Sequence, residues 1–188
     1  MTQGLPTAGP DGLLRCPWSL TSPDYLRYHD EEWGKPVRTD TGVFERLCLE
    51  AFQSGLSWLT ILRKRENFRR AFADFDIETV ARFGAADVSR LLADTGIVRN
   101  RAKIDAAVAN AQAALGLPDG LAAQVWKYAG AAPAPVSLAD VPSSTSGSRA
   151  LAKDLRSQGF RFTGPVTAYA MMQACGVVND HLAGCASR

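Results

Sequence analysis

The run DVSRLLADTGIVRNRAKIDAAVANAQAAL, residues 87–115, decides the fold of this chain. Its first part places Val88 and Leu91 on one face of a helix that stops near Gly96, because glycine is a poor helix former. A second helix begins at Arg99, and its apolar residues continue to the end of the run. The connector between the two is too short for anything but a tight turn. The stretch therefore predicts a helical hairpin.

The turn of this hairpin is also a candidate phosphate site. Backbone N–H groups at the start of a helix attract anions, and a DNA phosphate is such a group. The candidate contacts are Gly96 and Val98 in the turn and the basic residues Arg99, Arg101 and Lys103 after it. Contacts of this kind position DNA without reading its sequence. An ordinary pair of helices with a solvated basic face explains the same residues, so the pattern alone leaves both interpretations open.

Helical spacing of apolar residues continues through most of the remaining chain, and we find no convincing alternation typical of strands. Ser22 followed by Pro23 marks one helix start. Further helices are expected from Arg149 and over residues 39–56, 57–75, 76–83, 121–128 and 167–178. Residues 1–14 lack periodicity and are expected to form a flexible tail. We therefore predict an all-α fold, with residues 15–188 as a single domain of two helical lobes around a cleft.

Length and composition fit one ordinary globular domain. The chain has 188 residues, 46% of them hydrophobic, and its formal net charge is only +2. No apolar run approaches the ~18 residues of a membrane-spanning helix, and residues 1–12 lack the pattern of a secretory signal. We expect a cytoplasmic monomer without a membrane partner. Basic residues nevertheless gather in three places: RKRENFRR at residues 63–70, residues 99–103, and Arg149, Lys153, Arg156 and Arg161. A solvated helix face explains each cluster alone better, but the three together modestly favour a phosphate-contacting surface.

Both histidines and two of the four cysteines lie in two short segments at opposite ends of the chain. Cys16 and His29 are in the first segment, and His181 and Cys185 are in the second. This is the ligand set of a closed tetrahedral zinc site, which would be structural because no position is left for substrate. Free thiols and unrelated histidines are the alternative, whereas a disulfide is disfavoured in the cytosol. The residues alone leave this choice open.

Glu50 stands in an apolar run, between Leu49 and Ala51. A carboxylate in such a place is a candidate functional group in a cleft. A core glutamate paired with a basic side chain, or one that faces solvent, explains the position as well. The pattern alone favours these two plainer interpretations.

Aromatic residues crowd around these candidates, namely Trp18, Tyr25, Tyr28, Trp33 and Trp58. Aromatic side chains at this density usually build a core. The same rings would also suit the walls of a pocket for a flat, electron-poor ring. Together with a carboxylate, they would hold a cationic base by stacking and cation–π attraction.

Six stretches of the chain form a recognisable set: CPW from Cys16, YLRYHDEEWG from Tyr25, CLEAFQSGLSWLTILRKRENF from Cys48, DTGIVRNRAKI from Asp94, PSSTSGS from Pro142 and MQACGVVNDH from Met172. They cover most of residues 15–185. In their order and spacing they resemble the bacterial DNA-3-methyladenine glycosylase I family.

The resemblance implies an all-helical fold of the helix-hairpin-helix glycosylase superfamily, with a zinc-clipped terminal lobe. It implies a monofunctional DNA repair enzyme that acts on double-stranded alkylated DNA. Such an enzyme flips out 3-methyladenine, hydrolyses its N-glycosidic bond and leaves an abasic site. We identify no lysine nucleophile in the matched stretches, so strand cleavage is not expected.

The resemblance also assigns site residues in this chain. One structural Zn²⁺ per chain would be held by Cys16, His29, His181 and Cys185. The catalytic, base-recognising carboxylate would be Glu50. The base pocket would comprise Trp18, Tyr25, Tyr28, Trp33, Gln53 and Trp58. The family's hairpin would be Thr95 to Arg99, which includes the candidate DNA contacts Gly96, Val98 and Arg99, and Leu56 is expected to press into the gap left by the flipped nucleotide. Arg101 and Lys103 remain candidate contacts from the charge pattern alone.

The chain departs from the family in three places. Ala51 and Phe52 stand where the family has Gly-Gln, which would reshape one wall of the pocket. The segment after Cys185 is shorter than the Cys-rich tail often seen, and the N-terminal tail is extra. No departure removes Glu50 or a metal ligand.

Two rival functions use part of the same evidence. A non-enzymatic DNA-binding protein explains the hairpin and the Cys/His set, but it leaves Glu50 and the aromatic residues without a task. A zinc hydrolase requires an open metal position, which a set of two cysteines and two histidines normally closes.

Overall fold

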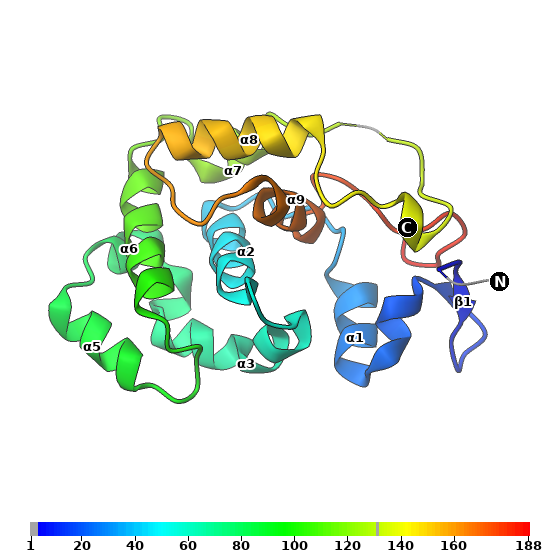
Figure 1. Ribbon diagram of the computed structural model, residues 1–188, viewed down its shortest axis with the longest axis horizontal. Helices are drawn as coiled ribbons and strands as arrows, with labels where there is room; N and C mark the ends of the chain where they lie inside the picture. Colours follow the sequence, from blue (N-terminus) through cyan, green and yellow to red (C-terminus); the bar gives the residue numbers. More distant parts are fainter. Residues whose placement is uncertain (1–3, 131) are drawn as a thin grey trace.

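The computed structural model describes residues 4–130 and 132–188, and nearly all of its regular structure is helical (Figure 1). The predicted helical fold class is thereby confirmed. Within these ranges no helix is both long and apolar enough to cross a membrane. In chain order the elements are β1 (Thr7–Ala8), β2 (Leu14–Arg15), the 3-10 helix η1 (Pro17–Thr21), α1 (Pro23–Glu31), α2 (Asp40–Gln53), α3 (Trp58–Ala71), η2 (Ala73–Phe75), α4 (Ile77–Ala81), α5 (Ala85–Ala93), α6 (Arg101–Leu115), α7 (Gly120–Trp126), η3 (Leu138–Asp140), α8 (Ser146–Ser157) and α9 (Pro165–Ala174).

Helix α2 lies at the centre of the hydrophobic core. It packs against α3, α6, α7 and α9, and Figure 1 shows it in the middle of the molecule. The Phe52 ring lies 4.7 Å from that of Phe68 and 5.7 Å from that of Phe72, all three fully buried. Buried aromatic rings contribute a large share of core stability. Side chains on the remaining face of α2 therefore stand on a rigid base.

Local sequence accounts for most of the helix starts. At six of them a polar side chain accepts a hydrogen bond from the backbone N–H three residues later, as N-cap residues do. These residues are Ser22, Thr39, Ser57, Asp76, Asn100 and Thr145. The start of a helix at Ser22 and Pro23, predicted from the sequence, is confirmed by α1.

Three helices end well before the residue that the sequence predicts: α2, α3, and α9, which ends at Ala174 instead of Val178. Helix α2 ends at Gln53, before the expected residue Leu56, and Gly55 then turns the chain with a φ of 82°. Glycine adopts this left-handed conformation without the steric cost that other residues have. Helix α3 ends at Ala71 instead of Phe75, and the backbone becomes left-handed from Ala73 to Phe75. The early end of α2 creates a short exposed loop in front of α3.

The helical hairpin predicted from residues 87–115 is present as α5 and α6. Its turn is tied down at several points. The Asp94 carboxylate accepts a hydrogen bond from Gly96 N at 2.7 Å. From α3, Lys64 Nζ donates to Thr95 O at 3.1 Å and Asn67 Nδ2 donates to Gly96 O at 3.2 Å. The turn is therefore held against α3.

The described part of the predicted tail, residues 4–14, contains regular structure that we did not expect. Strands β1 and β2 pair antiparallel, with Thr7 opposite Arg15. The Arg15 guanidinium then reaches Asp30 of α1 at 2.9 Å. This two-stranded hairpin lies in the segment expected to be a tail, and it leaves the confirmed helical fold class unchanged. Residues 1–3 lie outside the described residues, and the flexibility of the tail stays a prediction.

The first and last segments of the chain meet on one side of the molecule. Ala186 N donates to Leu14 O at 2.8 Å, and Leu182 N donates to Cys16 Sγ at 3.4 Å. Figure 1 shows β1 and the C-terminus on the same side of the molecule, opposite to α5 and α6. Residues that are far apart in sequence are thus brought into one cluster.

Candidate active site

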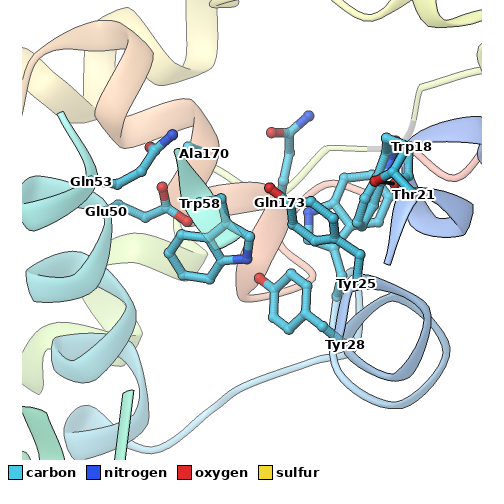
Figure 2. Close-up of a pocket in the computed structure, with 10 residues that line it drawn as sticks. Trp18, Thr21, Tyr25, Tyr28, Glu50, Gln53, Trp58, Ala170 and Gln173 are labelled. Carbon is cyan, nitrogen blue, oxygen red and sulfur yellow. Dashed lines mark hydrogen bonds between the residues drawn. The ribbon is translucent and has the colours of Figure 1, made fainter. Parts of the chain in front are cut away.

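A cavity of about 310 Å³ opens between two groups of elements, with η1 and α1 on one side and α2, α3 and α9 on the other. Figure 2 shows the α2 side chains across the cavity from those of η1 and α1, with Trp58 between them. The lining residues are Trp18, Thr21, Tyr25, Tyr28, Trp33, Glu50, Gln53, Trp58, Ala170 and Gln173. The structure therefore brings together every residue that we assigned to the base pocket, and Glu50 with them.

Glu50 and Gln53 share one face of α2 because they are three residues apart. The Glu50 side chain is 7% exposed, and its carboxyl group borders the cavity. Among the residues that the structure describes, none gives this carboxyl group an ion pair or a hydrogen bond. Burial alone raises the pKa of Glu50 to about 8. The alternative of a core glutamate paired with a basic side chain is therefore wrong.

Aromatic rings form the wall opposite Glu50. The Trp18 ring lies 5.1 Å from Trp33 and 5.6 Å from Tyr25, in both cases edge to face. The Tyr28 and Trp58 rings are 5.4 Å apart and tilted. Edge-to-face pairs of this kind are favourable beyond the area they bury. The wall is thus preorganised to accept a flat ring.

Two tyrosines link this wall to the helices behind it. Tyr25 Oη accepts a hydrogen bond from Leu59 N at 3.0 Å, which fixes α1 against the first turn of α3. Tyr28 is buried, and burial together with the nearby Glu50 carboxylate raises the pKa of its phenol well above the usual value. Tyr28 is therefore a neutral hydroxyl at the edge of the cavity.

One polar atom in the pocket is buried and has no partner. Trp58 Nε1 finds no hydrogen-bond acceptor among the described residues. Buried N–H groups are nearly always paired. A bound ligand with an acceptor atom would satisfy this group.

Three residues that line the cavity were not predicted from the sequence: Thr21, Ala170 and Gln173. Gln173 is held in place because its Nε2 donates to the Asp180 carboxylate at 2.8 Å. Asp180 also accepts a hydrogen bond from Tyr169 Oη at 2.5 Å. The stretch MQACGVVNDH contains Gln173, but only the packing of α9 against α2 brings this residue to the cavity.

Phe52 does not face the cavity. Phe52 belongs to the main hydrophobic core, as does its helix neighbour Leu49. Neither Ala51 nor Phe52 lines the pocket. A residue two positions after Glu50 on a helix points to nearly the opposite side. The expectation that Ala51 and Phe52 reshape a pocket wall is therefore wrong.

The Cys/His residues form a buried cluster next to the pocket. The ligand atoms of Cys16, His29 and Cys185 all lie within 4.8 Å of one another. Cys185 Sγ is 3.4 Å from His29 Nε2. Burial raises the pKa of Cys16 to about 12. These three residues present two thiols and one imidazole to a common point, which suits a soft divalent metal.

His181 lies beside the same cluster. Its ring centre is 4.8 Å from that of His29, and its Nδ1 contacts Asn179 Oδ1 at 3.0 Å. Its Nε2 is buried and has no partner in the described parts of the chain. Burial lowers the pKa of His181 to about 4, so the ring is neutral, which is the form that binds metals. His181 is not part of the group of three ligand atoms that lie within 4.8 Å of one another, and its unpaired Nε2 makes it the candidate for a fourth ligand.

Outer contacts orient the other histidine. His29 Nδ1 lies 2.7 Å from the Asp30 carboxylate, which leaves Nε2 free to face Cys185. Asp30 also accepts hydrogen bonds from Arg15 Nε at 2.9 Å and from Ser187 Oγ at 3.0 Å. A carboxylate behind a histidine is the usual arrangement in metal sites because it fixes the ring and raises its basicity.

The residues predicted to contact DNA differ in how exposed they are. Leu56 is 42% exposed on the loop after α2. Arg99 and Arg101 are exposed at the hairpin, and Gly96 and Val98 are half-buried in its turn.

Lys103 is different and requires a correction. Its side chain is 7% exposed, and its ammonium group donates to Phe52 O at 2.8 Å and to Ser54 O at 2.6 Å. A group that is buried and already engaged cannot contact a phosphate on the surface. We therefore withdraw Lys103 from the DNA contacts.

The fold is shared with known proteins. The chain is 45% identical over 179 residues to DNA-3-methyladenine glycosylase 1 of Escherichia coli (strain K12), covering 92% of this chain and 96% of that protein. It superposes on a crystal structure of 3-methyladenine DNA glycosylase I with a TM-score of 0.87 and 46% identity, covering 92% and 98% of the two chains. A tyrosine-to-phenylalanine variant of 3-methyladenine DNA glycosylase I in complex with 3-methyladenine gives a TM-score of 0.86 at 36% identity, covering 92% and 96%. Residues 18–188 match the methyladenine glycosylase family. On these grounds the chain belongs to the methyladenine glycosylase family.

Proposed function

We propose that this protein is a DNA repair glycosylase that hydrolyses the N-glycosidic bond of 3-methyladenine in alkylated DNA and leaves an abasic site. The observation that carries the proposal is Glu50, a buried carboxyl group that has no partner among the described residues and faces a wall of aromatic rings. Relatives that cover almost the whole chain are named for this activity. The proposal thus rests on both the site and the family.

The pocket suits the charge of this lesion. Methylation at N3 makes the base cationic in DNA, and a nearby positive charge favours the ionised form of a carboxyl group. Burial raises the pKa of Glu50 to about 8, so binding of the cation would release its proton. The carboxylate would then accept hydrogen bonds from the adenine edge. Trp58 and Tyr28 would stack on the ring and add cation–π attraction.

Base flipping brings the lesion into this pocket. Extruding a nucleotide costs a few kcal/mol, and less for a damaged, weakly paired base. Leu56, exposed on the loop after α2, would fill the gap in the duplex. Arg99 and Arg101, exposed at the start of α6, would hold the backbone phosphates. These contacts position the duplex, and the pocket selects the base.

The chemical step needs little acid catalysis because a cationic base is already a good leaving group. Water adds its oxygen to C1′ of the sugar and gives its proton to the surroundings. The bond from C1′ to the base breaks, and its electron pair leaves with the base as neutral 3-methyladenine. Among the described residues that line the pocket there is no lysine, so a covalent imine and strand cleavage are not expected. Selectivity follows because a wrong base leaves the polar groups of the pocket unpaired.

The proposed cofactor is one structural Zn²⁺, held by Cys16, His29, His181 and Cys185. Bound there, the ion would supply a cross-link between the first and last segments of the chain. The unpartnered Nε2 of His181 supports this assignment, as does the closeness of the other three ligand atoms. Four protein ligands leave no open position for a catalytic water.

The proposed partner is double-stranded alkylated DNA, bound by a monomer. The carboxyl group, the aromatic rings and the hairpin that the proposal requires are all supplied within this one chain. The zinc-clipped lobe and the helix-hairpin-helix class of the α5–α6 hairpin belong to the same proposal.

Base release tests the proposed function directly. Wild-type protein and Glu50→Gln are incubated with methylated duplex DNA, and the freed bases are separated by chromatography. We expect free 3-methyladenine from the wild type and far less from the variant, with similar DNA affinity for both. A folded, zinc-loaded wild type that binds DNA and releases no base would instead support a non-enzymatic DNA-binding protein. Equal losses of DNA affinity and excision in Glu50→Gln would make Glu50 a structural residue.

A further inference from the structure

Lys103 is buried, in contrast to its basic neighbours on the hairpin. Its side chain is 7% exposed, whereas Arg99 and Arg101 are exposed. An ammonium group that leaves water without compensation is strongly unfavourable, and desolvation lowers the pKa of Lys103. In the described parts of the chain no carboxylate forms an ion pair with it. Something other than an acidic side chain must stabilise its charge.

The stabilising groups are two carbonyls at the end of α2. Lys103 Nζ donates to Phe52 O at 2.8 Å and to Ser54 O at 2.6 Å. Carbonyls in the last turn of a helix have no partner within the helix and carry the negative end of its dipole. Lys103 supplies both hydrogen bonds and positive charge to this helix end. In sequence it is 51 and 49 residues away from these partners.

Several candidate site residues lie at or just after the end of α2, which Lys103 contacts. Gln53, between the two carbonyls, lines the pocket. Gly55 turns the backbone with a φ of 82°, Leu56 follows it on the surface, and Trp58 then lines the pocket from the first turn of α3. The ammonium group therefore anchors the start of a loop that carries both pocket residues and the residue expected to enter the duplex.

Lys103 also belongs to the segment that would hold the DNA backbone. It lies in the first turn of α6, where its backbone N–H donates to Asn100 Oδ1 at 3.1 Å. Arg101 is two residues earlier. Since the ammonium of one residue joins this segment to the end of α2, any placement of the hairpin on DNA also fixes the placement of the loop.

We propose that Lys103 is a positioning residue for base excision, which ties the end of α2 to the hairpin and so sets where Leu56 and Gln53 stand relative to the DNA backbone. This inference rests on the proposed glycosylase function. Lys103 does not touch the base. Without its ammonium group, the two carbonyls lose their partner and the loop loses its fixed distance from the hairpin.

The test compares Lys103→Met, which keeps the length of the side chain but removes its charge and donors, with Lys103→Arg. Lys153→Met is the matched control, because Lys153 is exposed on α8. Base release is measured in single turnover at saturating duplex DNA that contains 3-methyladenine. Flipping is followed by the fluorescence of 2-aminopurine beside the lesion. Binding of free 3-methyladenine is followed by tryptophan fluorescence.

For Lys103→Met we expect the single-turnover rate to fall by roughly 10- to 100-fold, as misplacement by about 1 Å produces. The flipping signal should fall with it. Affinity for free 3-methyladenine should fall less than the rate, because Glu50 and the rings of η1 and α1 keep their places, whereas Gln53 and Trp58 lie on the displaced stretch. Lys103→Arg should restore part of the rate, and Lys153→Met should match the wild type.

Other outcomes would overturn the inference. If Lys103→Met matches Lys153→Met in rate, Lys103 has no positioning role. If rate and free-base affinity fall together, in proportion to the folded fraction, the role is only structural. Should Lys103→Met fail to fold, Lys103→Gln, which keeps a hydrogen-bond donor but loses the charge, takes its place. A reduced rate with a smaller loss of base affinity supports the inference, and a wild-type rate contradicts it. A wild type that releases no base overturns the proposed function itself.

Discussion

The Trp33 indole lies 4.7 Å from the His181 imidazole, edge to face. One ring therefore borders the pocket on one side and the Cys/His cluster on the other. Trp18 stands in the same relation to His29, with ring centres 5.2 Å apart. The cluster and the aromatic wall are thus one packed unit. Loss of order in the Cys/His cluster should therefore disturb the aromatic wall of the pocket.

Cys185→Ala should abolish zinc binding and lower the free energy of unfolding by about 4 kcal/mol, as loss of a metal can. The tryptophan fluorescence and the affinity for 3-methyladenine should change too, because Trp18 and Trp33 lose their support. Metal content and thermal unfolding provide the measurement. Cys48→Ala, at a buried thiol outside the cluster, should keep its metal. Retention of one zinc per chain and of the wild-type Tm in Cys185→Ala would contradict the structural metal site.

Glu50→Gln should become more stable relative to the wild type as the pH rises. The pKa of Glu50 is about 8 in the folded protein against 4.5 for an ordinary glutamate. Between these values the unfolded chain has lost a proton that the folded chain retains. The wild-type free energy of unfolding should therefore fall by up to about 1.4 kcal/mol per pH unit from this group.

Urea denaturation of both proteins from pH 5 to pH 9 checks this prediction. Glutamine carries no charge, so the variant removes this contribution and leaves the other titrating groups in place. The stability difference should change through the window between the two pKa values and level off above pH 8. A difference that stays constant with pH would show that Glu50 is ionised in the folded protein.

Leu56→Ala should reduce base excision while leaving stability nearly unchanged. Its side chain is 42% exposed, and substitutions at exposed sites usually change stability by less than about 0.5 kcal/mol. Without the side chain, the gap in the duplex is not filled and the flipped state is less populated. Single-turnover base release and 2-aminopurine fluorescence measure the effect. Leu115→Ala, at an exposed leucine at the end of α6, is the control. Equal activity of the two variants would remove Leu56 from the DNA contacts.

Phe52→Gln introduces the residue that the family resemblance leads one to expect at this position. Because Phe52 is fully buried against Phe68 and Phe72, the change removes aromatic packing, which costs about 3–5 kcal/mol for a Phe-to-Ala change, and it buries an amide. We expect a large loss in urea denaturation but normal 3-methyladenine affinity in the folded fraction. Phe162→Gln, at an exposed phenylalanine, should have little effect. Normal stability with altered base preference would mean that Phe52 reaches the pocket.

Much of the site was predictable because its signals are local or come from residue type. The N-caps Ser22 and Thr39 mark helix starts, since a cap needs only a partner three residues away. Glu50 and Gln53 share a face by helical spacing alone. The aromatic residues, and the cysteines and histidines at the two ends, are recognisable by chemistry. The resemblance of the surrounding stretches to a known family then implied that these residues form one site.

Tertiary structure decided what depends on packing between distant segments. By sequence, Lys103 looks like its exposed neighbours, and only the contact with the end of α2, 51 residues away at Phe52, buries it. Gln173 reaches the pocket because α9 packs on α2. The direction of the Phe52 side chain likewise depends on which face of α2 meets the core. The sequence by itself determined the helices and the chemical groups, because both depend on neighbouring residues; burial and partners required the folded chain, because they are set by contacts that no local pattern records.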